Sequence, residues 1–172
     1  MTKPLIAITG ASSGIGEATA KAFSAAGHPL LLMARRLDRM QDLNLPNCLS
    51  EKVDVRDRDA IAKAVIKAED TYGPVDCLFN NAGIARLADI GEQDPTEWDE
   101  TVDINIKGVM NALHPFIKSM KERKAGTIVN MSSIAGRKVY PDHTVYCGSK
   151  YFVHAISESS VSYTHLTLPT KA

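Results

Sequence analysis

The sequence predicts a doubly wound α/β domain, a parallel sheet covered by helices on both faces. Three observations predict it. Short apolar runs alternate with longer segments of helical spacing, and a glycine-rich loop follows the first apolar run. The third is length: 172 residues, 44% of them hydrophobic, suffice for one buried core. Strands that alternate with helices pair in parallel through right-handed crossovers. With no internal repeat or low-complexity linker, residues 1–160 are expected to form one domain.

The expected strands are short apolar runs bounded by turn signals. They are residues 5–8, 30–34, 48–55, 75–79 and 126–133. In the third run, Val53 and Val55 lie on one face, because side chains alternate along a strand.

The segments between these runs are longer and carry helical spacing or charge. They are residues 15–26, 35–43, 57–72, 96–123 and 144–159. Gly27 closes the first segment, Pro46 breaks the charged second one, and Gly73 with Pro74 stops the third. The long fourth segment is expected to be interrupted near Pro115, because an interior proline removes one backbone donor.

Composition and charge exclude several classes of protein. Twenty basic and twenty acidic side chains cancel, whereas disorder and nucleic-acid binding are both associated with an unbalanced charge. The longest apolar runs are far shorter than the roughly 20 residues of a membrane span, and no secretory signal is visible. Cys48, Cys77 and Cys147 are scattered, and the histidines show no pair at ligand spacing, so neither a disulfide framework nor a metal site is expected. The composition predicts a soluble cytoplasmic protein with no membrane partner.

The glycine-rich loop TGASSGIG, residues 9–16, lies between the first strand and the first helix. Glycines let backbone amides approach a pyrophosphate, and the helix N-terminus adds partial positive charge. Glu17 follows Gly16, so the loop is not a P-loop, which needs Lys-Ser/Thr there. A plain glycine-rich turn is the alternative, but the position after an N-terminal strand favours dinucleotide binding. The expected cofactor-binding residues here are Thr9, Gly10, Ser12, Ser13, Gly14, Ile15 and Gly16.

The end of the second strand should decide the choice of cofactor. An acidic residue there would accept hydrogen bonds from a ribose 2′-hydroxyl, but this chain has Ala34, followed by Arg35 and Arg36. Guanidinium groups suit a 2′-phosphate, because they form bidentate charge-assisted hydrogen bonds. A solvated helix start would also explain such a pair. The missing acid favours NADP(H) over NAD(H).

A third feature is Tyr146 with Lys150, four residues apart and therefore on one helical face. A free tyrosine, with a pKa of about 10, is a poor acid–base catalyst at neutral pH, and a nearby ammonium favours its phenolate form. Ser133 lies thirteen residues before Tyr146, where the fifth strand leaves the sheet. Such a tyrosine–lysine pair alone is common on protein surfaces, so its combination with the other motifs carries the inference.

Five motifs in order resemble the short-chain dehydrogenase/reductase family. They are TGASSGIG, NNAG at 80–83, DINIKG around Asn105, NMSSIAG at 130–136 and YCGSK at 146–150. The resemblance extends from Lys3 to about Ser159. It implies a Rossmann-like sheet of strand order 3-2-1-4-5 and an NADP(H)-dependent oxidoreductase that transfers hydride between nicotinamide and a carbonyl or secondary alcohol.

The same resemblance implies roles for four catalytic residues. Tyr146 exchanges a proton with the reacting oxygen, and Lys150 assists it and holds the nicotinamide ribose. Ser133, rather than Ser132, orients the reacting oxygen, and Asn105 holds a water that links Lys150 to solvent.

Further cofactor contacts are implied in the same way. Asp54 meets the adenine ring, Val55 is a further cofactor-binding residue, and Asn81, Ala82 and Gly83 support cofactor and sheet. Arg35 matches the basic position of NADP-preferring members, whereas Ser13 stands where some members carry a second basic residue. The helices at 96–123 and around Tyr146 resemble those that pair between subunits, so a homo-oligomer is expected if they fold.

The family's pattern stops near Ser159. The sixth strand, its Pro-Gly turn and the substrate-covering loop are not found, and residues 161–172 form a threonine-rich segment unlike the family. A foreign tail on a truncated chain and a natural short variant both remain open. We expect weak or no activity of this polypeptide. A non-catalytic dinucleotide-binding module and an inert partner-binding fragment are the alternatives to an enzyme.

Overall fold

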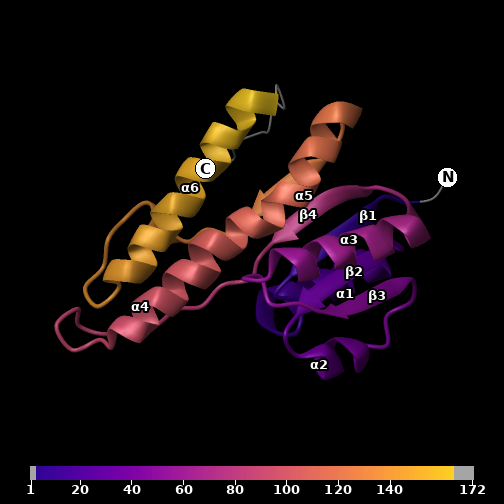
Figure 1. Cartoon of the computed structure of the whole chain (residues 1–172). Coiled ribbons are helices and arrows are strands. Elements are labelled where there is room, and N and C mark those ends of the chain that lie inside the picture. Colours follow the sequence, from indigo (N-terminus) through magenta and orange to yellow (C-terminus); the bar gives the residue numbers. More distant parts are fainter. Residues whose placement is uncertain (1–2, 165–172) are drawn as a thin grey trace.

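A computed structural model describes residues 3–164, with the side chains of residues 3–160 (Figure 1). Its centre is a five-stranded parallel sheet of order β3-β2-β1-β4-β5, which confirms the predicted order. The strands are β1 (Leu5–Thr9), β2 (Leu30–Ala34), β3 (Cys48–Lys52), β4 (Val75–Asn80) and β5 (Thr127–Asn130). In the central pairs, Ile6 lies opposite Leu30, and Ala7 opposite Leu78.

Burial explains the composition of the strands. Every residue of β1 and β2 is buried, as expected of strands covered on both faces. The edge strand β3 is only half-buried and correspondingly more polar. It ends at Lys52 rather than Val55, because the chain bends into a turn in which the Asp57 amide bonds to the Asp54 carbonyl. Val53 and Val55 are nevertheless both buried.

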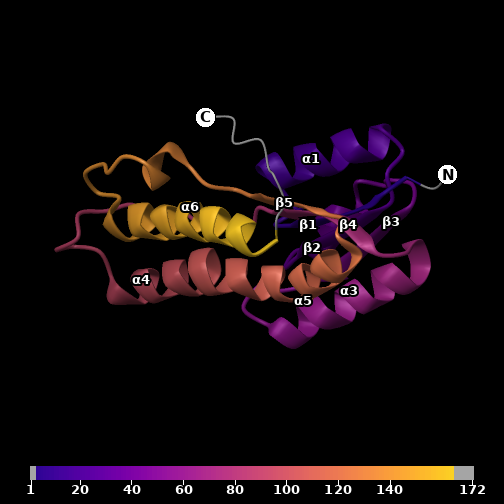
Figure 2. The same ribbon diagram turned by 90° about the horizontal axis from the view of Figure 1, so that it is seen from above.

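Helices cover both faces of the sheet (Figure 2). On one face lie α1 (Gly14–Ala25) and the short α2 (Leu37–Gln41), which pack on Ile6, Ile8, Leu30 and Leu32. On the other face lie α3 (Arg58–Tyr72), α5 (Gly108–Arg123) and α6 (Thr144–Thr164). Alternating residues of the same strands therefore enter two separate cores.

The long fourth segment is interrupted, but the expected position near Pro115 was wrong. α4 (Pro95–Val102) passes into a π-helical turn at Asp103–Lys107, and α5 then continues through Pro115. Leu113 and Phe116, on either side of the proline, are buried in the core. This packing outweighs the loss of one backbone hydrogen bond, which costs about 1 kcal/mol. Such π turns are frequent at functional sites.

The last described helix, α6, follows a loop that contains a 3-10 turn at Ile134–Gly136. It runs to Thr164, five residues beyond the expected end. The remaining part of the expected tail, 165–172, lies outside the described residues, so the tail's origin stays a prediction. Within the described part of the chain, no helix combines the length and apolar character needed to cross a membrane.

Candidate active site

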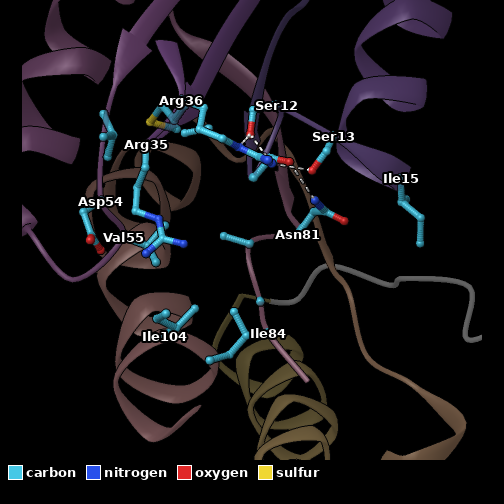
Figure 3. Close-up of a pocket in the computed structure, with 16 residues that line it drawn as sticks. Ser12, Ser13, Ile15, Arg35, Arg36, Asp54, Val55, Asn81, Ile84 and Ile104 are labelled. Atoms are coloured by element: carbon cyan, nitrogen blue, oxygen red, sulfur yellow. Dashed lines mark hydrogen bonds between the residues drawn. The ribbon is translucent and has the colours of Figure 1, made fainter. Parts of the chain in front are cut away.

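A cavity of about 570 Å³ opens at the carboxyl ends of β1, β2 and β4, where ligands bind in open α/β sheets (Figure 3). Most of the predicted cofactor-binding residues line it. They are Gly10, Ser12, Ser13, Ile15, Arg35, Arg36, Asp54, Val55, Asn81, Ala82 and Gly83. Met33, Ala34, Val53, Ile84 and Ile104 complete the lining.

Three other predicted residues, Thr9, Gly14 and Gly16, shape the loop without lining the cavity. The Thr9 hydroxyl accepts hydrogen bonds from the amides of Asn81 and Ala82, at 2.9 and 3.0 Å, and so ties β1 to the turn after β4. Gly14 has φ +57°, a left-handed conformation that favours glycine. A Cβ on Gly16 would lie 2.4 Å from the Gly10 carbonyl oxygen, so the helix can approach the loop this closely only with glycine.

The two arginines after β2 diverge (Figure 3). The Arg36 guanidinium crosses to the glycine loop and donates to the hydroxyls of Ser12 and Ser13, at 3.1 and 2.7 Å. Arg35 extends instead toward Asp54 and Val55. No carboxylate stands at the end of β2, where Ala34 is buried. Positive charge therefore borders the cavity at this end.

Asp54 forms an ion pair with Arg56, whose Nη2 lies 2.6 Å from the carboxylate. Hydrogen bonds from the Arg56 side chain hold the pKa of Asp54 below its usual value. Asp54 is therefore an anionic hydrogen-bond acceptor at neutral pH.

Lys150 is buried on α6, and its Nζ donates to the Met131 carbonyl at 2.9 Å. The same ammonium lies 5.7 Å from the centre of the Tyr146 ring. Burial lowers the pKa of Lys150, since the charged form loses solvation. A Cβ on Gly83, which lines the cavity, would lie 3.7 Å from this Nζ. Lys150 therefore lies next to the cavity, although neither Lys150 nor Tyr146 lines it.

Asn105 sits in the π-helical turn, buried against α6. Its side chain accepts from the Ile84 amide and donates to the Ile84 carbonyl, both at 2.8 Å. Nδ2 also donates to the Ser149 hydroxyl at 3.1 Å. Ser149, which was not predicted, in turn donates to the Tyr146 carbonyl at 2.7 Å. Asn105 and Ser149 thus join the turn after β4 to the helix that carries Tyr146 and Lys150.

The two serines after β5 have different partners. The Ser133 hydroxyl accepts from the Ala135 amide at 3.1 Å and caps the 3-10 turn. The Ser132 hydroxyl donates to the Lys150 carbonyl at 3.2 Å. Among the described residues, neither serine hydroxyl is hydrogen-bonded to Tyr146.

Several residues of the site escaped the sequence reasoning. Met33, Val53 and Ile104 are apolar residues at or near element ends, and an apolar side chain carries no chemical signal of its own. Ile84 also lines the cavity. Its place directly after the NNAG motif was the available signal. Within residues 3–160, no group of three or more His, Cys, Asp or Glu side chains is placed to hold a metal ion.

Comparison with known proteins places this geometry in a family. A family model described as short chain dehydrogenase matches residues 4–163. An uncharacterised oxidoreductase of Staphylococcus saprophyticus is 39% identical over 158 residues, covering 90% of this chain and 64% of that protein. Sulfoacetaldehyde reductase 2 of Chromohalobacter salexigens is 37% identical over 158 residues, covering 87% of this chain and 62% of that protein.

Solved structures agree. Serine dehydrogenase from Escherichia coli has a TM-score of 0.89 at 30% identity, covering 94% of this chain and 76% of that one. The closed form of serine dehydrogenase complexed with NADP+ has a TM-score of 0.90 at 30% identity. The match covers 94% of this chain and 66% of that one. The chain thus spans a little under two thirds of the length of the curated relatives named above. The chain belongs to the short-chain dehydrogenase/reductase family.

Proposed function

We propose that this protein is an NADP(H)-dependent oxidoreductase that acts on a carbonyl or secondary alcohol. One observation carries the proposal: a single cavity extends from two guanidinium groups at the end of β2 to a turn adjoining the buried ammonium of Lys150. A relative's structure with bound NADP+ supports it. The substrate is a small molecule, and nucleic acid and membranes are not among its partners.

The residues present fit a phosphorylated dinucleotide. The glycine loop and the N-terminus of α1 suit a pyrophosphate, because unpaired amides and the helix dipole both favour an anion. Arg35 and Arg36 suit a 2′-phosphate, and Asp54 with Val55 forms the adenine end. The nicotinamide ring, when bound, supplies the hydride.

The chain's own residues manage the proton. The Tyr146 hydroxyl donates a proton to the substrate oxygen in reduction and accepts it in oxidation. Lys150 stabilises the phenolate by its charge and holds the ribose hydroxyls. Ser133 orients the reacting oxygen with its hydroxyl proton, which stays available while the serine oxygen accepts from the Ala135 amide, and Asn105 keeps Lys150 in contact with solvent through a water.

Cofactor preference is tested by fluorescence titration of the single tryptophan, Trp98, with NADPH and with NADH. We expect NADPH to bind more tightly. Arg35→Met should weaken NADPH binding about 10- to 100-fold, since charge-assisted hydrogen bonds contribute about 1.5–3 kcal/mol, and leave NADH binding nearly unchanged. Arg39→Met is the control, because it removes the same charge outside the cavity. Equal affinity of the wild type for both cofactors would contradict the NADP(H) preference.

Catalysis is tested separately with Tyr146→Phe. If the protein is an enzyme, this variant binds NADPH normally and loses carbonyl reduction. A non-catalytic binding module would bind NADPH and show no turnover in either form, and an inert fragment would not bind it. Single-turnover oxidation of NADPH is the suitable measurement, because it detects slow chemistry as well as fast.

Two further expectations concern the whole protein. We propose that it is cytoplasmic and that it forms a homo-oligomer through α4, α5 and α6. Sedimentation equilibrium measures the second directly, and a monomer at all concentrations would contradict it.

A further inference from the structure

The turn at residues 54–57 separates two cavities. Asp54 and Val55 line the cofactor cavity, and Asp54 also lines a second, polar cavity of about 820 Å³ on the other side. Asp103, Lys107 and Asn111, from the π-helical turn and α5, line only this second cavity. The adenine end of the cofactor site is therefore supported from behind by α5.

Asn111 makes the central contact with this turn. It is buried, and its Nδ2 donates to the Val55 carbonyl at 2.9 Å. Its Oδ1 accepts from Arg58 Nε at 2.7 Å. Because the guanidinium can only donate, it fixes the amide so that Nδ2 points at Val55. The orientation of the Asn111 side chain is therefore determined on both sides.

Gly108, one helical turn earlier on α5, sets the distance between helix and turn. A Cβ on Gly108 would lie 2.6 Å from Val55 Cγ2, so the two backbones can approach this closely only with glycine. α5 is itself held by the core, where Leu113 and Phe116 are buried. The Val55 side chain and carbonyl thus rest on a rigid surface.

We propose that Asn111 is a positioning residue for the adenine end of the cofactor, acting through the backbone of Val55. It does not line the cofactor cavity and so does not touch the ligand itself. Without its amide, the Val55 carbonyl loses its side-chain donor and the turn loses its fixed position. This inference rests on the proposed function, since it presumes that a dinucleotide binds there.

Two variants remove the contact in different ways. Asn111→Asp keeps an acceptor for Arg58 and the same shape, but cannot donate to Val55. Asn111→Leu removes both bonds without adding charge, so an effect common to the two variants is not a charge effect. Phe116→Leu is the matched control, because it loosens α5 from its buried side without a contact to the turn.

Isothermal titration calorimetry with 2′,5′-ADP and with reduced nicotinamide mononucleotide separates the two halves of the site. We expect both Asn111 variants to bind 2′,5′-ADP about tenfold more weakly and the mononucleotide within about twofold of wild type. Phe116→Leu should bind both ligands as wild type does. Hydrogen exchange of the peptide around Val55 should accelerate in the Asn111 variants alone.

Two results would overturn the inference while leaving the proposed function intact. One is unchanged 2′,5′-ADP affinity in both Asn111 variants. The other is an equal loss for both ligands, matched by Phe116→Leu, which indicates a general loosening of α5. If the wild type binds neither ligand, the proposed function fails, and this inference fails with it.

Discussion

Replacing Gly16 by alanine is expected to destabilise the protein through a clash between helix α1 and the glycine loop. The new Cβ would lie 2.4 Å from the Gly10 carbonyl oxygen and 2.7 Å from Asn81 Nδ2. Ordinary contact begins near 3.4 Å, so the loop or the helix must move by about 1 Å. The backbone of Gly16 itself has an ordinary φ, so the effect is steric and not conformational.

Gly10 cannot move freely. Its amide donates to the Met33 carbonyl at 2.9 Å, and Asn81 Nδ2 donates to the carbonyls of Thr9 and Gly10 at 3.1 and 3.4 Å. Relief of the clash therefore breaks or lengthens about two hydrogen bonds of about 1 kcal/mol each, or leaves overpacking of similar size. We expect a loss of about 2–3 kcal/mol in unfolding free energy and a melting temperature lower by about 5–10 °C.

Urea unfolding followed by Trp98 fluorescence measures this loss, and Gly14→Ala is the matched control. Gly14 lies two residues away in the same loop, has φ +57°, and leaves its Cβ with nothing within 4 Å. Gly14→Ala should lower the unfolding free energy by only about 1 kcal/mol, because alanine is strained in the left-handed conformation. Equal stability of Gly16→Ala and wild type, or a larger loss in Gly14→Ala, would refute the reasoning from close approach.

Three other predictions follow from single sites. Burial raises the pKa of Cys77 to about 11, so a thiol reagent at pH 8 should label it at least 100-fold more slowly than a free cysteine; comparable rates would contradict this. Asp57 caps α3 by accepting from the Ala60 amide at 3.0 Å, so Asp57→Ala should lower the free energy of urea unfolding by about 1 kcal/mol. Asp59→Ala is the control, because it removes a carboxylate from the first turn and leaves the cap in place. Burial lowers the pKa of Lys150, so the folded state binds fewer protons there than the unfolded state, between the lowered pKa and about 10.4. Relative to Lys150→Met, the unfolding free energy of wild type should therefore rise with pH across that window, and a flat difference would contradict it.

Much of the fold was readable because its signals are local. The buried runs of β1 and β2 are continuous and apolar, and glycines or prolines mark several of the ends, so the parallel topology followed from the alternation of elements. The strand order was implied by the family resemblance. The break in the long helix was misplaced at Pro115, because the proline was weighed without the core that surrounds it. The end of β3 was also misplaced, since the chain bends after Lys52 into a turn that the Asp57 amide closes on the Asp54 carbonyl, and the valines on either side of that bend still look like a strand.

The candidate site was readable to the extent that its residues carry distinctive chemistry. The glycine loop and the arginines carry a chemical signal at their places after β1 and β2, whereas the expected role of the Tyr146–Lys150 pair came from the family resemblance. Ser149 and Asn111 carry no such signal. Each bonds to a segment far away in sequence: the Ser149 hydroxyl accepts from the Asn105 side chain, and the Asn111 amide donates to the Val55 carbonyl.

The sequence by itself determined the parallel sheet, the glycine loop and the residue types available for chemistry, because these depend on local spacing and on side-chain identity. Only the tertiary structure decided that Arg36 lies across Ser12 and Ser13 while Arg35 turns toward Asp54. It also decided that Gly108 and Asn111 of α5 contact Val55, which lines the cavity. These arrangements depend on how segments distant in sequence pack, and packing is a property of the whole core rather than of any one motif.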